Sequence, residues 1–186
     1  EILKQLSINT KSYKNMDVDF NFHFENKTQE INEKQDGNIK INGNKFRLEL
    51  NQQIVISDNT TQWIYIKESN ELQIMEHDPE DDILSPNKLF TIYENGYKNN
   101  YVELKEESEK KTHIIDLFPI ESNEFTKIQL HIDAEKIQLK NIILHDKNGG
   151  TFTYLITKFL TNTEMDQKAF SFNSDEYPDI EIIDLR

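Results

Sequence analysis

The sequence predicts an all-β fold with minor helices, in which one strongly curved antiparallel sheet of about eleven strands forms a single domain over residues 1–186. Residues 16–25 alternate strictly between apolar and polar side chains, and residues 43–75 resemble four short strands joined by tight turns. Strands and helices do not alternate regularly, as they would in a parallel sheet. The length suits one hydrophobic core, and an antiparallel sheet of this size has to curl, split or close.

The first expected element is a helix over residues 1–14. Its apolar side chains recur at helical spacing in a narrow stripe made by Ile2, Leu3, Leu6, Thr10 and Tyr13. The clearest strand follows over residues 16–25, with one wholly apolar face made by Met16, Val18, Phe20, Phe22 and Phe24. Its other face is polar, which is typical of an antiparallel sheet with one solvated side. A second strand is expected over residues 28–41.

Residues 43–75 are expected to form a meander with one broad apolar surface that needs a cover. Phe46 and Leu48 alternate with charged residues in its first strand, and Trp63 and Tyr65 share one face of a later strand. Residues 57–60, Ser-Asp-Asn-Thr, have the chemistry of a tight turn. Asp and Asn favour such turns because they tolerate left-handed backbone and bond their own main chain.

The second half of the chain predicts a short helix followed by five strands. Residues 77–82 are expected to form an acidic loop, after which Ser85 can cap a helix over residues 86–95 that Gly96 ends. Leu89, Phe90 and Tyr93 form the apolar face of this helix. The strands are expected at residues 97–107, 111–118, 125–133, 137–146 and 151–161, and residues 170–186 are expected to be extended.

Composition excludes several classes of function. The chain has 34 acidic and 21 basic residues and a formal net charge of -13, so its field repels nucleic-acid backbones and anionic membranes. It contains no cysteine, which excludes disulfides and thiol chemistry, and no apolar stretch long enough to span a membrane. We therefore expect neither nucleic-acid binding nor a transmembrane span.

The sequence also offers no catalytic or metal-binding motif. Its five histidines show neither an i, i+4 pair nor a His-Glu motif, so no zinc site is expected. The acids of residues 78–82 lack the glycine and terminal Glu of a calcium loop, and a solvated loop is the favoured interpretation. Phosphate-binding, dinucleotide and nucleophile-elbow motifs are absent. We expect no cofactor, no metal and no enzymatic activity.

Several segments together resemble the outer-membrane lipoprotein carrier (LolA) family. Residues 57–65, Ser-Asp-Asn-Thr-Thr-Gln-Trp-Ile-Tyr, are similar to the Ser-Asp-Gly turn and Thr-x-Trp-x-Tyr motif of members, with Asn59 where glycine is usual. Residues 86–98 resemble the central helix of the family, residues 115–119 its Asp-Leu-x-Pro strand end, and residues 177–186 its C-terminal segment. These matches keep the family's order and cover nearly the whole chain.

The resemblance implies an incomplete, half-open barrel whose helices cover a hydrophobic cavity. It also implies a periplasmic carrier, with a signal peptide already removed, that takes lipoproteins from an inner-membrane transporter to an outer-membrane acceptor and acts as a monomer. The apolar strand and helix faces of the chain are expected to line the cavity: Phe20, Phe22, Phe46, Leu48, Ile54, Ile56, Trp63, Tyr65, Leu89, Phe90, Tyr93, Leu117, Leu130, Phe152 and Tyr154. Some of these residues must serve as ordinary core.

Two other functions fit the same features, and the sequence differs from the pattern of the family at one position. A lipid-anchored acceptor of the same fold would share all these features, and a hydrolase acting on lipid or glycan in the cleft is a further alternative. Well-known members carry an Arg just before the Phe of the third strand, which bonds to the lid. Here Lys45 precedes Phe46 and Arg47 follows it, on the opposite face of the strand, so no residue inherits that role.

Overall fold

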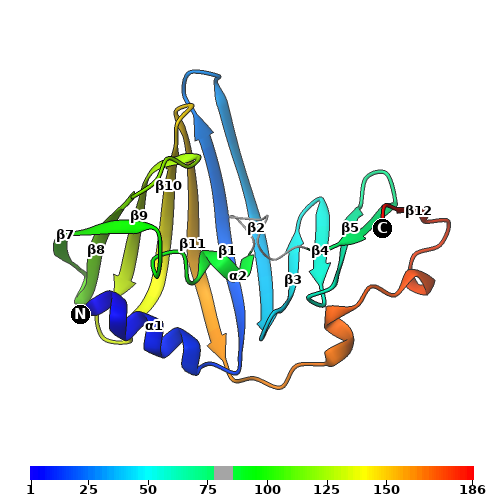
Figure 1. The fold of residues 1–186 in the computed structure, drawn as a ribbon, viewed down its shortest axis with the longest axis horizontal. Helices are drawn as coiled ribbons and strands as arrows, with labels where there is room; N and C mark the ends of the chain where they lie inside the picture. The colour runs from blue at the N-terminus through cyan, green and yellow to red at the C-terminus, as the bar shows by residue number, and fades with distance from the viewer. Residues whose placement is uncertain (78–85) are drawn as a thin grey trace. The chain divides into compact units, whose positions relative to one another are not determined.

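The computed structural model describes residues 1–77 and 86–186 (Figure 1). Its strands form one twelve-stranded sheet, hydrogen-bonded in the order β12-β6-β5-β4-β3-β2-β1-β11-β10-β9-β8-β7. The sheet is largely antiparallel, but β12 pairs with β6 in parallel. The bounds of the elements are α1 Ile2–Ser12, β1 Asn15–Asn26, β2 Ile31–Asn42, β3 Lys45–Leu50, β4 Gln53–Ser57, β5 Thr61–Ile66, β6 Glu71–Glu76, α2 Pro86–Leu89, β7 Tyr97–Glu107, β8 Lys110–Pro119, β9 Phe125–Asp133, β10 Gln138–Asp146, β11 Gly150–Thr161, η1 Gln167–Phe170, η2 Ser174–Glu176 and β12 Glu181–Asp184.

The fold class expected from the sequence is confirmed, with two corrections. The C-terminal end is not merely extended, because Glu181–Asp184 adds a twelfth strand beside β6.

The helix expected over residues 86–95 ends at Leu89. β-Branched Thr91 and Ile92 follow it, which disfavours continuation of the helix. The N–H of Glu94 bonds the carbonyl of Thr91 at 3.0 Å and closes a tighter turn instead. The acidic residues 78–82 and Ser85 lie outside the described residues.

The chain divides into two compact units. Unit 1 comprises Glu1–Ser12, Phe20–Asp36 and Phe90–Thr157, and unit 2 comprises Tyr13–Asp19, Gly37–Leu89 and Lys158–Arg186. Strands β1, β2 and β11 contribute residues to both units. The sequence-based expectation of one domain, and of a sheet that closes around a cavity, stays a prediction.

Unit 1 has its core on one face of β8 to β11. Leu117, Ile128, Leu130, Ile132 and Leu144 in these strands are fully buried. Helix α1 lies against β10 and buries Leu6 (Figure 1). Asn9 of α1 donates from Nδ2 to the carbonyls of Lys136 and Ile137, both at 3.2 Å, and so holds the helix to the turn between β9 and β10.

Unit 2 presents two apolar faces, not the single surface expected for the meander. The register pairs Arg47 with Ile56 and Glu49 with Ile54, so the isoleucines of β4 share a face with the charged residues of β3. Phe46 and Leu48 point to the other face, together with their partners in β2, Ile41 and Ile39. The period of a strand is two residues, so a one-residue difference in register moves every side chain to the other face.

Candidate functional site

Unit 1 gathers several of the predicted cavity residues into two rows that cross four strands. Because directly opposite residues of an antiparallel pair share a face, the register defines both rows. One row runs through Leu117, Ile128, Leu144 and Phe152, and the next runs through Ile115, Leu130, Ile142 and Tyr154. The structure thus brings Leu117, Leu130, Phe152 and Tyr154 together, although they lie on three strands.

Aromatic rings of β1 and β11 extend this face into a continuous series, which we call the aromatic ladder: Phe20, Tyr154, Phe22, Phe152 and Phe24. Its successive ring centroids are 5.8, 5.1, 6.4 and 4.6 Å apart. Burial in this apolar setting raises the pKa of Tyr154 to about 12. At pH 7 the ladder is therefore uncharged.

Exposure separates the predicted residues of the cavity into two groups. Phe20, Phe46, Ile54, Ile56, Tyr65, Phe90, Tyr93, Leu117 and Leu130 are buried. Phe22, Leu48, Trp63, Leu89, Phe152 and Tyr154 are partly exposed. A ligand can contact the second group without displacing the packed core. In unit 1 this group comprises the rings of Phe22, Phe152 and Tyr154, which belong to the aromatic ladder.

The structure separates the predicted residues of the meander. Ile54, Ile56, Trp63 and Tyr65 lie on the face opposite Phe46 and Leu48. The chain's own C-terminal segment packs against them through Phe172, Tyr177 and Ile180. In Figure 1 this segment, coloured orange to red, runs past β3, β4 and β5 and ends at β12, which pairs with β6. Within unit 2, these four residues therefore already have an intramolecular cover.

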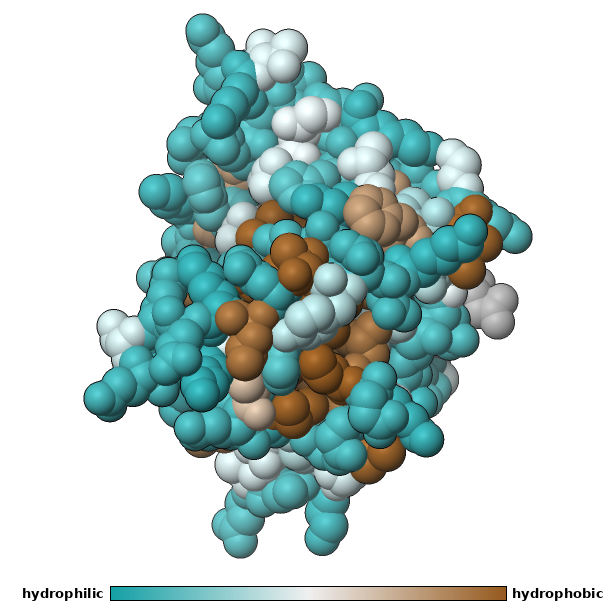
Figure 2. Space-filling view, turned by 90° about the vertical axis from the view of Figure 1, so that its left-hand side faces the viewer, coloured by the Kyte–Doolittle hydropathy of each residue, from teal (hydrophilic) through white to brown (hydrophobic). Residues whose placement is uncertain are grey.

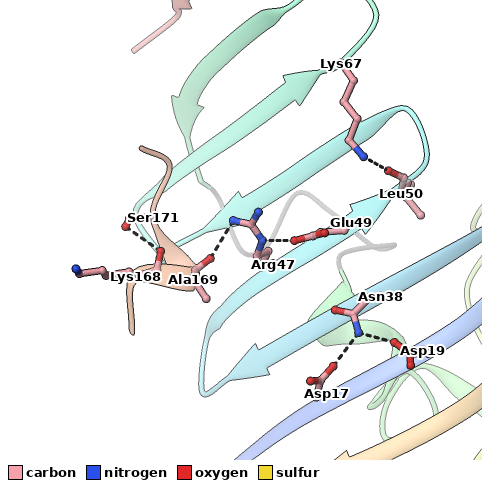
Figure 3. A network of polar contacts seen from close by, with 10 residues as sticks. All are labelled: Asp17, Asp19, Asn38, Arg47, Glu49, Leu50, Lys67, Lys168, Ala169 and Ser171. Atoms are coloured by element: carbon pink, nitrogen blue, oxygen red, sulfur yellow. Dashed lines mark hydrogen bonds and ion pairs between the residues drawn. The ribbon is translucent and has the colours of Figure 1, made fainter. Parts of the chain in front are cut away.

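Arg47 belongs to the covered face of unit 2. Figure 3 shows its guanidinium between β3 and the C-terminal segment, where Nε donates to Glu49 Oε1 at 2.5 Å and Nη1 donates to the carbonyl of Ala169 at 3.4 Å. On the neighbouring strands, Asn38 donates from Nδ2 to Asp17 at 2.8 Å and Asp19 at 2.6 Å. These contacts fasten the strands and the C-terminal segment of unit 2.

The residues expected on one helix face have different surroundings. Leu89 ends α2, which lies against β3 in unit 2. Phe90 and Tyr93 follow the helix in unit 1, where they are 4% and 6% exposed. The expected common helix face is therefore wrong, because the helix ends before Phe90.

A pocket of about 430 Å³ lies between α1 and the turn that leads into β7. Helix α1 lines it with one stripe of side chains, Leu3, Lys4, Ser7, Ile8 and Lys11. Its other wall consists of Tyr93, Glu94, Asn95 and Asn99. The size is within the range of small-molecule sites.

Glu94 connects the two walls of this pocket. Its Oε1 accepts a hydrogen bond from Ser7 Oγ at 2.5 Å, and its Oε2 pairs with Lys11 Nζ at 2.9 Å. Burial alone would raise the pKa of Glu94, but the hydrogen bonds from Lys11 and Ser7 and the charge of Lys11 lower the pKa below its usual 4.5. One residue earlier, the hydroxyls of Tyr93 and Thr10 are 3.3 Å apart.

This pocket was not expected from the sequence. Lys4, Ser7 and Lys11 recur at helical spacing, so their common face was readable from the sequence. Glu94 had no such signal, because only the tertiary structure places it next to α1.

The side of the molecule with β7, β8 and the start of α1 carries an area of hydrophobic side chains bordered by hydrophilic ones (Figure 2). On the edge strand β7, Tyr101, Val102 and Leu104 are 45% to 48% exposed.

Within residues 1–77 and 86–186, no three His, Asp or Glu side chains are grouped as metal ligands. The described helices include none with the length and apolarity of a membrane span.

Comparison with known proteins identifies a family model over most of the chain. The model of the outer membrane lipoprotein carrier protein LolA matches residues 11–173. No curated protein matches the chain. Each of the following structures is 11% identical or less, so the likeness concerns the fold.

The first of three similar solved structures is an uncharacterized conserved protein from Thermus thermophilus, at 11% identity and a TM-score of 0.63, covering 98% of this chain and 96% of that one. A LolA superfamily protein from Nitrosomonas europaea has 10% identity and a TM-score of 0.51, with 92% and 96% covered. The Mycobacterium tuberculosis lipoprotein LppX has 9% identity and a TM-score of 0.52, with 89% and 95% covered.

Proposed function

Because the chain belongs to the LolA family of outer membrane lipoprotein carrier proteins, we propose that it is a periplasmic carrier of lipoproteins. It binds their acyl chains on an apolar surface and catalyses no reaction. It acts as a monomeric single domain, receiving acylated lipoproteins from an inner-membrane transporter and passing them to an outer-membrane acceptor.

The observation that carries this proposal is the partly exposed aromatic ladder on the apolar face of unit 1. Phe22, Phe152 and Tyr154 offer ring surface to a ligand, while the fully buried Ile128 and Leu144 beside them keep the sheet folded. Burial of each methylene group of an acyl chain contributes about 0.8 kcal/mol. The cost of ordering a long flexible chain offsets much of this gain, which allows release.

The test compares two charged substitutions on the same face. Phe22→Asp places a carboxylate beside the bound chain, and Leu144→Asp places one in the fully buried core. We expect Phe22→Asp to weaken capture of a purified triacylated lipoprotein severalfold, since it removes ring surface that the ligand would cover and places a charge against an apolar chain. Its thermal midpoint should fall much less than that of Leu144→Asp, where an unpaired charge is buried.

Phe90 gives a second comparison, because its burial predicts a structural role. Phe90→Asp should lower the thermal midpoint as severely as Leu144→Asp. Wild-type protein that fails to keep the triacylated lipoprotein in solution would contradict the carrier proposal. Unchanged capture by a folded Phe22→Asp variant would contradict the location of the site.

A second candidate is a lipid-anchored protein of the same fold. The similarity to the mycobacterial lipoprotein LppX favours it, since that protein is itself described as a lipoprotein. Mass spectrometry of the protein purified from its own cells distinguishes the two candidates. An acylated N-terminal residue supports the anchored form, and an unmodified one supports the carrier.

A further inference from the structure

The pocket beside α1 combines apolar and cationic walls. Leu3 and the 52% exposed Ile8 supply apolar surface from α1, and Tyr93 belongs to the opposite wall of the pocket. Lys4 and Lys11 line the pocket from the same helix stripe. A pocket of this size and mixed character suits a molecule that has both an apolar part and a charged group.

The charges of the pocket contrast with those of the protein. The whole chain carries a formal charge of -13, yet the pocket holds two lysines and one carboxylate, that of Glu94. Glu94 pairs with Lys11, and Lys4 forms no ion pair within the described part of the chain. The residues that line the pocket therefore have a formal charge of +1, from two lysines and one glutamate, against the negative charge of the chain.

Glu94 acts within this arrangement as an internal counter-ion. It holds Lys11 Nζ at 2.9 Å and Ser7 Oγ at 2.5 Å, so an incoming anion has to compete with a carboxylate that is already bound. Lys11 is 63% exposed and reaches the pocket from the last turn of α1, which allows its ammonium group to move to a new partner.

We propose that this pocket binds the anionic head group of an amphiphile, which Lys4 and Lys11 contact while its apolar chain packs on Leu3 and Ile8. This goes beyond the proposed function, because the acyl chains of a lipoprotein carry no such charge. A phosphate or a carboxylate head group supplies the same chemistry, and binding assays with both kinds of probe separate them.

The test measures binding of four soluble probes to the full chain by calorimetry: decyl phosphate, decanoate, the uncharged decyl maltoside and inorganic phosphate. We expect at least one of the two anionic amphiphiles to bind more tightly than decyl maltoside, and inorganic phosphate alone to bind weakly. The tighter of decyl phosphate and decanoate identifies the head group. Higher salt should weaken anionic binding and leave decyl maltoside unaffected.

Three substitutions should change the affinity for the anionic amphiphile in different ways. Lys4→Gln should weaken binding of the anionic amphiphile about two- to fivefold, the usual range for one exposed ion pair. Glu94→Gln should strengthen it by a similar factor, because the internal competitor loses its charge. Ser7→Ala removes a contact between α1 and Glu94 but keeps the carboxylate, so it should not strengthen binding.

Glu94→Gln separates a ligand-binding role from a structural one. If Glu94 only fastens α1, both Glu94→Gln and Ser7→Ala would lower the thermal midpoint and neither would improve binding, which would overturn the proposal. Equal affinity for decyl maltoside and both anionic amphiphiles, or an unaffected Lys4→Gln variant, would also overturn it. Lipoprotein capture is measured separately with Phe22→Asp, so either proposal can fail without the other.

Discussion

Asp58 and Asn59 show how single residues determine a turn in this chain. Asp58 Oδ1 accepts hydrogen bonds from Thr60 N at 2.9 Å, Thr60 Oγ1 at 2.8 Å and Thr61 N at 2.8 Å. Asn59 has a φ of 85°, in the left-handed region that glycine and asparagine tolerate best. The backbone at this position therefore suits asparagine as well as glycine.

The pH dependence of stability should reveal the contribution of Asp58. Burial alone would raise the pKa of Asp58, but hydrogen bonds from the backbone of Thr61 and Thr60 and from the Thr60 hydroxyl lower the pKa below 3.8. A lowered folded-state pKa stabilises the protein at pH values above 3.8, and this stabilisation disappears as the pH falls through the folded-state pKa. Asp58→Ala should therefore cost about 1 kcal/mol at pH 7, and less near pH 3.

Urea unfolding of the wild type and Asp58→Ala between pH 7 and pH 2.5 measures this difference. Asp58→Asn is the matched control, because its side-chain oxygen can still accept the turn hydrogen bonds without a charge. It should retain more stability at pH 7 than Asp58→Ala. A difference between wild type and Asp58→Ala that stays constant over this pH range would contradict the explanation.

At the scale of elements, the C-terminal segment stabilises unit 2 by covering its second apolar face. The Tyr65 ring lies 4.5 Å from that of Tyr177 and 5.5 Å from that of Phe172, and these last two rings stack at 4.8 Å. Beyond them, Asn70 donates to the carbonyl of Pro178 at 3.0 Å, and β12 pairs with β6. The face is thus covered by side chains and by added sheet hydrogen bonds.

Tyr177→Ala should destabilise the protein by about 1–3 kcal/mol, since the ring is partly exposed and the loss is smaller than for a fully buried aromatic. Tyr101→Ala is the matched control, because Tyr101 is 48% exposed on the edge strand β7. Urea unfolding gives both values. The fluorescence of Trp63, which packs against the same cluster, should shift to longer wavelength only in Tyr177→Ala. Equal effects of both substitutions would disprove the covering role.

Local patterns were sufficient for most elements, but not for those that depend on distant partners. The alternation of Phe20, Phe22 and Phe24 predicts β1 from the sequence alone. Strand β12 has only four residues and forms through pairing with β6, so no local pattern reveals it. The two faces of the meander depend on register, which places Ile54 opposite Glu49, and the alternation of each strand alone does not specify that pairing.

At the scale of the whole molecule, the candidate site was partly predictable. Phe22, Phe152 and Tyr154 were expected on an apolar sheet face, and the structure brings their rings together on neighbouring strands. The pocket beside α1 was not expected, because only the packing of α1 within unit 1 brings Glu94 to Ser7. Apolar alternation is a repeated signal, whereas a polar contact between residues 87 positions apart has no local signature.

The net charge of -13 makes a prediction about the whole molecule. Excess acidic charge opposes the compact state through self-repulsion, which dissolved salt screens. Raising NaCl from about 10 mM to about 300 mM at pH 7 shortens the screening length from about 30 Å to less than about 10 Å. The thermal midpoint should rise by about 2–4 °C for each kcal/mol of repulsion relieved.

Scanning calorimetry measures the change, with sucrose at equal osmolality as the uncharged control. Because exposed ion pairs such as Lys105–Glu107 are weakened by the same salt, a midpoint that falls would show that attraction between surface charges outweighs the net repulsion.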